Sequence, residues 1–356
     1  MSAMRKHRGN IEIDERERSL NAYQHRHAHN YFVLGARRAE DGAVEDARRL
    51  LLQSLSYDPS QASALQALAQ LELAQNCPAQ ARAYAERLLA LCPADADVHA
   101  LLGNIALCEQ RPEQALLAFA HAEALGGEAP ELRYNTGLAH LSLGHGESAA
   151  RIFLAVIDEQ PTNARAWDAL GCARRFLRDH AGALQAFMQA LQHDPRLNDA
   201  RDHLAQLLLD TGNVPRARQI LEAALSLEPH RPGSLHLLGM AFARLQDVPH
   251  AIACWEELLA HGGAPSDTYH LLANAYLHMD DEARARQTLE TLVTRFPEQA
   301  PGHIQLALLL FRNGQLDNGH RHLALAKLLD PENPTLQQAF LAAERLAAQQ
   351  SPPLGE

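Results

Sequence analysis

The sequence has little of several residue types, and each shortage narrows the range of possible folds. Aromatic residues make up only 5% of the 356 residues, whereas Ala and Leu supply most of the 47% that are hydrophobic. Ala and Leu favour helices, and a sheet protein would contain more Val, Ile, Thr and aromatic residues. The charged fraction of 21% is too low for a disordered chain with this much apolar content. The composition therefore predicts an all-α protein.

Paired cysteines and long apolar runs are also missing. No Cys-x-x-Cys pair occurs, and no run approaches the 18 apolar residues of a membrane helix. The first 20 residues contain no apolar segment of a secretory signal. We therefore expect a cytoplasmic protein without membrane insertion, in which the cysteines are small hydrophobic residues and neither a disulfide framework nor a zinc site. The scattered cysteines are Cys77, Cys92, Cys108, Cys172 and Cys254.

Positive charge is scarce as well. The formal net charge is −11, and Lys6 and Lys327 are the only lysines among 32 basic residues. An acidic surface repels phosphate backbones, and the arginines form no basic patch, so we expect no nucleic-acid partner. The preference for Arg, Ala, Leu and His indicates a GC-rich genome, and we expect a bacterial source.

Helix-breaking residues recur at a fixed interval. Successive prolines are separated by 34 residues or by twice that distance, and Gly127 and Gly263 occupy the two vacant places in the series. This period divides residues 28–333 into nine repeats of 34 residues, with no insertion. The prolines of the series are Pro59, Pro93, Pro161, Pro195, Pro229, Pro297 and Pro331.

Other repeat positions are equally regular. Position 8 is always Gly or Ala, position 20 is Ala in eight repeats and Gly319 in the ninth, and position 24 is large in every repeat except at Ala85. Small residues allow two helices to approach closely, and the large residues fill the space around that contact. Position 15 is glycine in four repeats, where a positive φ can end the first helix. These glycines are Gly42, Gly144, Gly212 and Gly314.

This pattern resembles the tetratricopeptide repeat family, whose 34-residue helix–turn–helix signature it follows. The fifth repeat matches nearly every signature position, with Trp167, Leu170, Gly171, Ala183, Phe187, Ala190 and Pro195. The resemblance implies a right-handed α-solenoid of stacked helix pairs. Outside the repeats we expect a polar N-terminal extension at 1–27, frayed at first and helical towards its end. We also expect a C-terminal capping helix at 334–349 and a disordered tail at 350–356.

Motifs of catalysis are missing. The sequence has no Walker A motif, no G-x-S-x-G elbow and no H-E-x-x-H. His25 and His29 are spaced like metal ligands on a helix, but no Glu, Asp or Cys accompanies them at a matching distance. We therefore predict no catalytic residue, no metal and no cofactor. The sequence leaves open whether His25 and His29 bind a metal.

The family resemblance implies that the first helix of each repeat lines a concave groove. Carboxamides there could bind the main chain of an extended peptide, because each offers a donor and an acceptor. Some members of the family bind the terminal carboxylate of a peptide with asparagines and three basic residues at fixed repeat positions. This sequence matches those positions at Asn104, Asn135 and Arg165, but Ala100 and Ala169 replace two of the three basic residues. The predicted peptide-binding residues are Asn104, Asn135, Arg165, Asp168, Asp202, Gln206 and Asn274.

A groove with an apolar floor and acidic walls fits the sequence better than a carboxylate clamp. Position 12 carries leucines from Leu73 to Leu277, and acidic residues gather in the middle of the chain, from Asp97 to Asp210. Such a groove would suit a basic or amphipathic segment of another protein. Alternatively, the leucines pack between neighbouring helices and the acids are solvated surface.

The sequence thus predicts a non-catalytic scaffold or adaptor that binds a peptide segment of a partner, in secretion, envelope assembly or a regulatory complex. The alternative is a regulatory or substrate-recruiting subunit of an enzyme on a separate chain, because the sequence ends 23 residues after the last repeat. The oligomeric state is not predicted.

Overall fold

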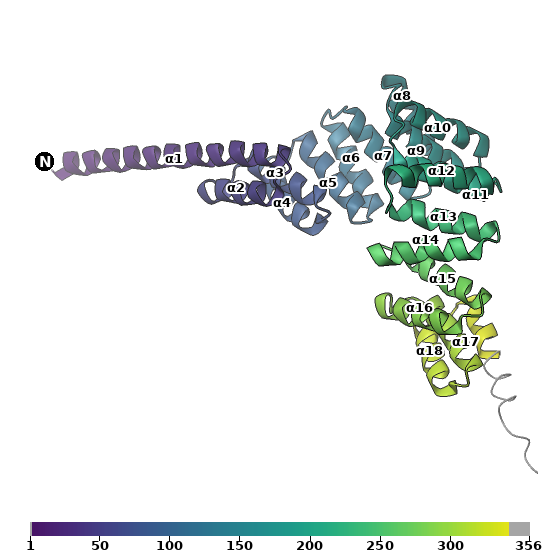
Figure 1. Ribbon diagram of the computed structural model, residues 1–356. Helices are drawn as coiled ribbons and strands as arrows, with labels where there is room; N and C mark the ends of the chain where they lie inside the picture. The colour runs from purple at the N-terminus through teal and green to yellow at the C-terminus, as the bar shows by residue number, and fades with distance from the viewer. Residues whose placement is uncertain (1, 342–356) are drawn as a thin grey trace, which may run out of the picture. The chain divides into compact units, whose positions relative to one another are not determined.

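A computed structural model shows a chain of stacked α-helix pairs (Figure 1). It describes the backbone of residues 2–341 and the side chains of residues 21–341, and no strand occurs in that part of the chain. This arrangement confirms the all-α repeat fold. The helices are α1 (Ser2–Glu40), α2 (Val44–Tyr57), α3 (Ala62–Ala74), α4 (Pro78–Leu91), α5 (Ala96–Cys108), α6 (Pro112–Ala124), α7 (Pro130–Ser142), α8 (Gly146–Glu159), α9 (Ala164–Phe176), α10 (His180–His193), α11 (Asn198–Asp210), α12 (Val214–Leu227), α13 (Pro232–Arg244), α14 (Val248–His261), α15 (Ser266–His278), α16 (Glu282–Arg295), α17 (Ala300–Arg312) and α18 (Leu316–Leu329).

The chain forms two compact units, residues 1–186 and residues 187–356, with the boundary inside α10. In both units the odd-numbered helices from α3 onward begin at the first residue of a 34-residue repeat and run for 13 residues. Each even-numbered helix forms the second half of its pair. The helix boundaries therefore follow the period of the prolines and glycines in the sequence.

The turn inside each repeat depends on one backbone conformation. All nine residues at position 15 have a positive φ, between 57° and 82°. Four of them are the glycines expected there, but Asn76, Gln110, Arg178, Gln246 and Asp280 adopt the same conformation without being glycine. The turn geometry is thus imposed by the packing of the two helices, and five repeats accept local strain to keep it.

The close approach of the two helices in a pair depends on glycine at position 8. A Cβ atom added to Gly103 would lie 2.2 Å from Cε1 of Phe119, and one added to Gly239 would lie 2.2 Å from Nε1 of Trp255. Both aromatic rings are buried, with at most 1% exposure. Where position 8 is alanine, as at Ala205, position 24 holds the smaller Leu221. The larger side chain at position 8 is therefore accommodated by a smaller side chain at position 24.

Ion pairs connect neighbouring repeats at buried or partly buried carboxylates. In the first unit Arg48 of α2 donates to Glu72 of α3, whose carboxylate is nearly inaccessible, and Arg82 of α4 makes two bonds of 2.8 and 2.6 Å to Glu109. The hydrogen bonds from Arg82 hold the pKa of the Glu109 carboxyl below its ordinary value. Such charge-assisted, bidentate pairs fix the register of one repeat on the next.

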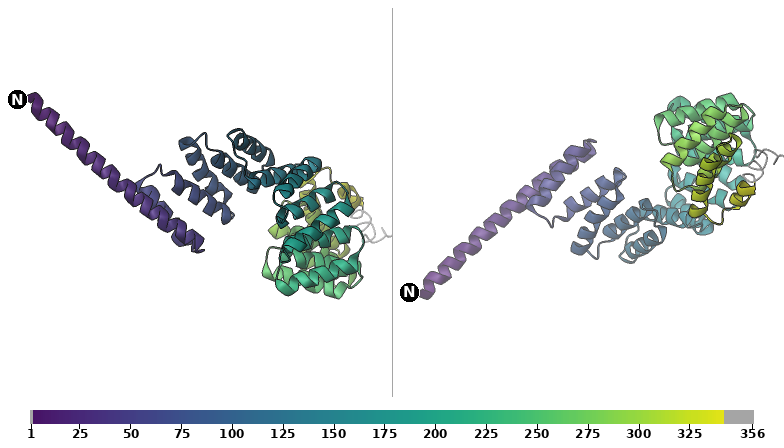
Figure 2. Two further views of the ribbon diagram at one scale, coloured as in Figure 1. Left: turned by 90° about the horizontal axis from the view of Figure 1, so that it is seen from above. Right: turned by 90° about the horizontal axis from the view of Figure 1, so that it is seen from below.

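The N-terminal extension belongs to a long helix in the structure. One continuous helix, α1, runs from Ser2 to Glu40 and projects well beyond its partner α2 (Figures 1 and 2). The ring of Tyr57 on α2 stacks on those of His27 and Tyr31, with centroids 5.3 and 5.5 Å apart. These contacts anchor the part of α1 that belongs to the first repeat.

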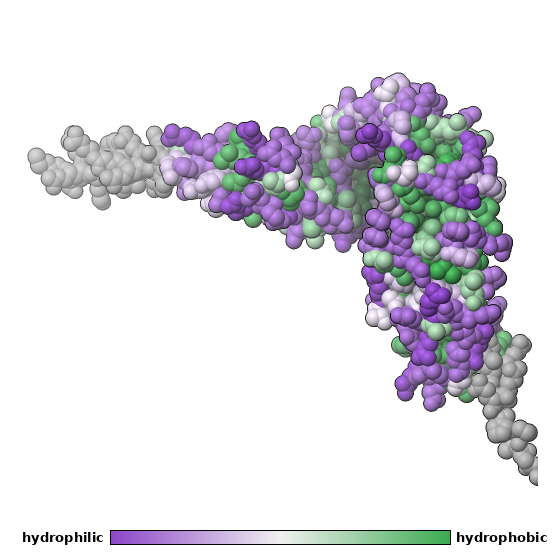
Figure 3. Space-filling model, in the orientation of Figure 1, coloured by the Kyte–Doolittle hydropathy of each residue, from purple (hydrophilic) through white to green (hydrophobic). Residues whose placement is uncertain are grey.

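At the other end, residues 334–341 form a helix that packs on the ninth repeat. Leu336 and Ala339 are buried in one apolar cluster with Phe311 and Leu323. The remainder of the predicted cap and the predicted tail at 350–356 lie outside the described residues. No helix in the part of the chain that the structure covers is long and apolar enough to span a bilayer. In the view of Figure 3 hydrophilic residues cover most of the surface of each unit, with hydrophobic patches between them.

Candidate functional site: an acidic groove in the first unit

A cavity of about 830 Å³ opens in the first unit along three successive odd-numbered helices, α3, α5 and α7. The loop between α6 and α7 closes one side of it. Its lining residues are Gln66, Gln70, Leu73, Ala74, Asp95, Ala96, Asp97, Ala100, Leu101, Asn104, Gly126, Gly127, Glu128, Ala129, Glu131, Leu132 and Asn135. A groove over three helices is long enough for an extended segment of several residues.

Two of the predicted carboxamides meet in this groove. Asn135 of α7 donates from Nδ2 to Oδ1 of Asn104 on α5, at 2.8 Å, and both side chains are half-buried. This bond orients both amides and leaves the Nδ2 group of Asn104 as a donor and Oδ1 of Asn135 as an acceptor. The pair thus offers one hydrogen-bond donor and one acceptor to the C=O and N–H groups of a peptide main chain.

The walls of the groove are acidic. Asp95, Asp97, Glu128 and Glu131 line it, and none of its lining residues is basic. All four are exposed, and among the residues that the structure describes none of them forms an ion pair. Asp95 also caps α5 by accepting a hydrogen bond from the backbone N–H of Asp97, at 2.9 Å. The groove therefore concentrates negative charge that none of the arginines whose side chains are described in this unit pairs with.

The apolar floor is smaller than the sequence suggested. Leu73, Leu101 and Leu132 line the groove, but Leu107 packs against a buried cluster of the first unit. In the second unit Leu209 and Phe311, at the same position 12, are almost completely buried. Several position-12 residues are therefore part of the core, as the alternative interpretation held.

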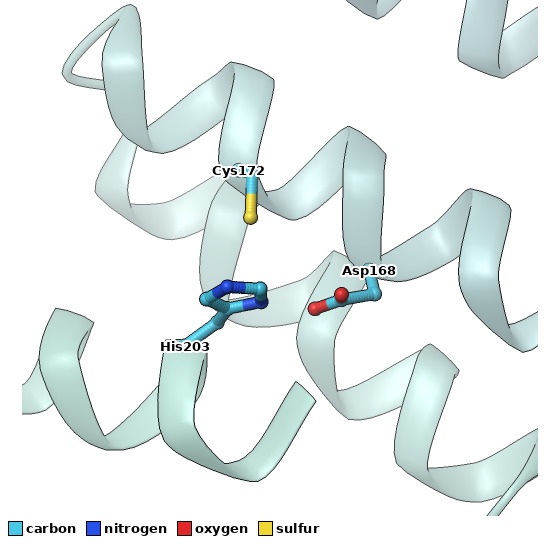
Figure 4. A group of neighbouring side chains, drawn as sticks. All are labelled: Asp168, Cys172 and His203. Carbon is cyan, nitrogen blue, oxygen red and sulfur yellow. The ribbon is translucent and has the colours of Figure 1, made fainter. Parts of the chain in front are cut away.

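Other predicted groove residues lie outside this cavity. Arg165 is exposed on α9 and does not line it, so the structure does not place a basic residue beside the carboxamide pair. Asp168 and Cys172 lie one turn apart on one side of α9 (Figure 4). His203, also shown there, belongs to α11 of the other unit.

In the second unit the predicted residues are engaged by neighbours. Asp202 is buried and accepts hydrogen bonds from Arg231 at 2.9 Å and from Ser234 at 2.5 Å, and Arg231 also pairs with Asp199. Gln206 donates to Asp210 at 2.8 Å. These contacts give Asp202 a packing role between α11 and α13, and its charge is neutralised by Arg231.

A second carboxamide pair occurs near the end of the second unit. Gln305 of α17 donates to Asn274 of α15 at 3.4 Å, and the two sit at the same repeat positions as Asn135 and Asn104. They line a smaller cavity of about 390 Å³, together with Leu277, Leu308 and Arg312. No carboxylate lines this cavity, and its Arg312 pairs with Glu282 at 3.0 Å, so it lacks the unpaired negative charge of the groove of the first unit.

The two histidines considered as metal ligands make separate contacts. His25 bonds to Asp58 at 2.9 Å, and the ring of His29 lies near that of Phe32, with centroids 6.3 Å apart. Each histidine therefore has its own neighbour on or near the first repeat.

Sequence reasoning missed three polar residues that line the groove of the first unit. Gln66 is at position 5 of its repeat, while Asp95 and Glu128 lie in the loops that connect one repeat to the next. Asp95 and Glu128 were missed because only helix positions were considered as groove-facing, although the loop ends were visible in the same 34-residue alignment. Including them would have doubled the number of predicted acidic residues here.

Comparison with known families identifies the repeats. The model of the tetratricopeptide domain of cytochrome c-type biogenesis protein H matches residues 153–269, and two general tetratricopeptide repeat models match residues 100–164 and 267–298. The repeat-containing protein YpiA of Bacillus subtilis is 22% identical over 162 residues, which are 46% of this chain and 38% of that protein.

Solved structures share the fold at low sequence identity. The Cut9–Hcn1 hetero-tetramer of the APC/C aligns with a TM-score of 0.57 at 18% identity, over 84% of this chain and 59% of that one. A human IFIT1 dimer with m7Gppp-AAAA aligns with a TM-score of 0.59 at 14% identity, over 90% and 81% of the two chains. The chain spans less than two thirds of YpiA and of the Cut9–Hcn1 chain.

The matches to the three repeat models lie consecutively between residues 100 and 298, and the helix pairs continue with the same period on both sides of that range. The chain is a tetratricopeptide repeat protein.

Proposed function

We propose that this protein is a non-catalytic interaction scaffold whose first unit binds an extended, basic segment of a partner protein in its acidic groove. The observation that carries the proposal is the cavity over α3, α5 and α7, in which an oriented carboxamide pair lies among four carboxylates. Tetratricopeptide repeats generally serve protein interaction, and the chemistry of this groove narrows the class of segment.

The carboxamide pair accounts for binding of a main chain. Once Asn135 has donated to Asn104, a peptide unit can accept from Nδ2 of Asn104 and donate to Oδ1 of Asn135. These contacts do not depend on the side chains of the partner, so they favour extended backbone over any one sequence. The mutual hydrogen bond orders both amides before binding, which lowers the entropy cost of association.

The carboxylates account for the charge of the partner. Asp97 on α5 and Glu131 on α7 occupy position 2 of consecutive repeats, and Asp95 and Glu128 lie in the loops just before those helices. A Lys or Arg side chain would enter a field of unneutralised negative charge, which raises the association rate and lets salt weaken binding. The same field would repel phosphate groups, so we propose a protein segment and not a nucleic acid as the occupant of this groove.

A peptide array tests the proposal. We expect the full chain to bind segments rich in Lys or Arg, and a fluorescent copy of a captured segment gives the affinity by anisotropy. The variant Asp97→Asn with Glu131→Gln should bind at least tenfold more weakly, a loss of about 1.4 kcal/mol. The matched control is Glu113→Gln with Glu123→Gln, two exposed glutamates of α6 that do not line the groove.

The control removes the same net charge, so it separates the groove from the general attraction of a chain with net charge −11. Equal weakening of binding in both variants would show that the segment senses overall charge alone and would contradict a groove site. Unchanged binding in the groove variant would place the partner elsewhere.

A second candidate function is supported by the match to the tetratricopeptide domain of cytochrome c-type biogenesis protein H, which covers residues 153–269. In this case the chain would be the recruiting subunit of an assembly enzyme on a separate chain. That function predicts co-purification with a catalytic subunit and a binding surface on α11–α14, the helices of the second unit within the matched range, and the groove variant would leave complex formation unchanged.

We also propose that the protein is bacterial and lies in the cytoplasm. The cytoplasmic location is supported by the five cysteines, which are all free in the structure and whose spacing suits a reducing compartment. Fractionation of the native host tests this proposal, and recovery of the protein outside the cytoplasm would refute it.

A further inference from the structure

The turn between α12 and α13 brings a histidine to the last turns of α14. His230 lies in that turn, and Glu257 and His261 lie one helical turn apart on α14. Ligand atoms of these three residues all lie within 4.8 Å of one another. The Nδ1 atom of His230 is 3.0 Å from Oε1 of Glu257, which is close to the spacing of two ligands in the shell of one ion.

The hydrogen bonds of His261 prepare it for metal binding. Its Nδ1 atom lies 3.0 Å from the backbone carbonyl oxygen of Glu257, and a carbonyl can only accept, so Nδ1 carries the proton. The lone pair is then on Nε2, which is the free ligand atom. Metal-binding histidines characteristically donate their other ring nitrogen to a carbonyl or carboxylate in this manner.

The charges around the group also favour a cation. The one basic neighbour in the sequence, Arg231, is engaged by Asp199, Asp202 and Glu228. Glu257 forms an ion pair only with His230 among the described residues, so its negative charge is available when that histidine is neutral. Two imidazoles and a carboxylate form a ligand set that Zn²⁺ accepts.

We propose that His230, Glu257 and His261 bind one Zn²⁺ ion, which connects the turn before α13 to the end of α14 in the seventh repeat. One ring must turn to bind, because the two imidazoles are stacked with centroids 3.9 Å apart and a metal lies in the plane of each ring it binds. His230 and His261 are both exposed, and rotation of His230 would keep the hydrogen bond that fixes the tautomer of His261. The three protein ligands leave a coordination position open to water or to a partner's side chain.

The ion would stabilise the second unit by joining residues 27 or more positions apart, because a site that forms only in the folded chain couples binding to folding. The inference does not rest on the peptide groove, since the cluster lies in the second unit and the groove in the first.

Isothermal titration of the untagged full chain with Zn²⁺ tests the site. The wild-type chain should bind one equivalent that the variants His230→Ala and His261→Asn bind at least tenfold more weakly, and Zn²⁺ should raise its melting temperature more than theirs. The control is His250→Asn, another exposed histidine of α14, which pairs with Asp247 at the opposite end of the helix. The control variant should bind Zn²⁺ like the wild type. It accounts for weak Zn²⁺ binding by histidines outside the site, since the chain has 20 histidines in all.

Co²⁺ provides a second readout, since a tetrahedral Co²⁺ complex absorbs visible light and an ion held only in water does so weakly. The absorption should appear in the wild type and in the control, and Glu257→Gln should reduce it. Equal stoichiometry and affinity for Zn²⁺ in the wild type, His230→Ala and His261→Asn would overturn the proposal.

Discussion

The contact between positions 8 and 24 leads to a prediction about Gly103. In a helix, Gly→Ala ordinarily stabilises by up to about 1 kcal/mol. At Gly103 the new Cβ would lie 2.2 Å from Cε1 of Phe119, far inside normal contact, and this ring is completely buried. The three atoms nearest to the new Cβ all belong to the rigid ring of Phe119, which lies in one buried cluster with Ala106, Ala115 and Ala122.

Overpacking of this kind costs about 1–3 kcal/mol, which exceeds the gain in helix propensity. We therefore expect Gly103→Ala to destabilise the first unit by about 1–2 kcal/mol, which for a unit of this size lowers the melting temperature by roughly 2–8 °C. The sign of the change is the decisive result, because propensity and packing predict opposite signs.

A double-mutant cycle assigns the effect to the ring. Repeat six already combines alanine at position 8 with leucine at position 24, as Ala205 and Leu221, and both are completely buried. Gly103→Ala with Phe119→Leu should therefore be more stable than the sum of the single changes predicts, by about 1 kcal/mol or more. Thermal unfolding followed by circular dichroism measures all four proteins. If Gly103→Ala were as stable as the wild type, or if the two changes were simply additive, this reasoning would be refuted.

Three further predictions concern the turn, an ion pair and the C-terminal cap. Gln110→Gly should stabilise the first unit by up to about 1 kcal/mol, since Gln110 has a φ of 60° and glycine relieves that strain; a loss of stability in urea unfolding would show that its side chain matters more. Glu109→Gln should cost about 1.5–3 kcal/mol near neutral pH, where the charged pair with Arg82 is intact. Because Arg82 lowers the pKa of Glu109 in the folded state, the stabilisation is present above the pKa of the unfolded chain and is lost as pH falls through the folded value. The stability difference between wild type and variant should thus shrink in acid, and a constant difference from pH 7 to pH 3 would contradict it. Leu336→Ala should cost about 2–5 kcal/mol locally, measured as faster hydrogen exchange in α17 and α18, whereas Leu341→Ala, at an exposed position of the same helix, should leave exchange unchanged.

The repeat fold could be predicted because its signals recur. The series from Pro59 to Pro331 marks every repeat boundary, and the helices from α3 onward begin where that series places them. From the sequence, the turn at position 15 could be recognised only in the repeats in which that position is glycine. In repeats such as the fifth, Arg178 takes the same positive φ, and no local preference of arginine would have shown it. There the packing of the two helices determines the backbone.

The candidate site could be predicted only in part, because it depends on side chains from different repeats. Asn104 and Asn135 were predicted from helix positions alone, and the structure pairs them. The same reasoning included Asp202, but it could not show that Arg231, 29 residues later, would neutralise that carboxylate. A repeat alignment gives the position of a residue on its helix. The hydrogen-bond partner of that residue depends on which residue type occupies the facing position in the next repeat.

This difference explains why the groove is confined to one stretch of the first unit. Neighbouring repeats bring position 9 of one helix to position 6 of the next, and that junction holds two amides at Asn104 and Asn135 and again at Asn274 and Gln305. The first junction lies among carboxylates and the second beside Arg312. The second junction lacks the carboxylates of the first, and Oε1 of Gln305 is already bonded to His270, so the two grooves would select different segments. A basic peptide that binds the first unit should therefore bind the second weakly, and exchanging Arg312 for Glu should strengthen its binding there.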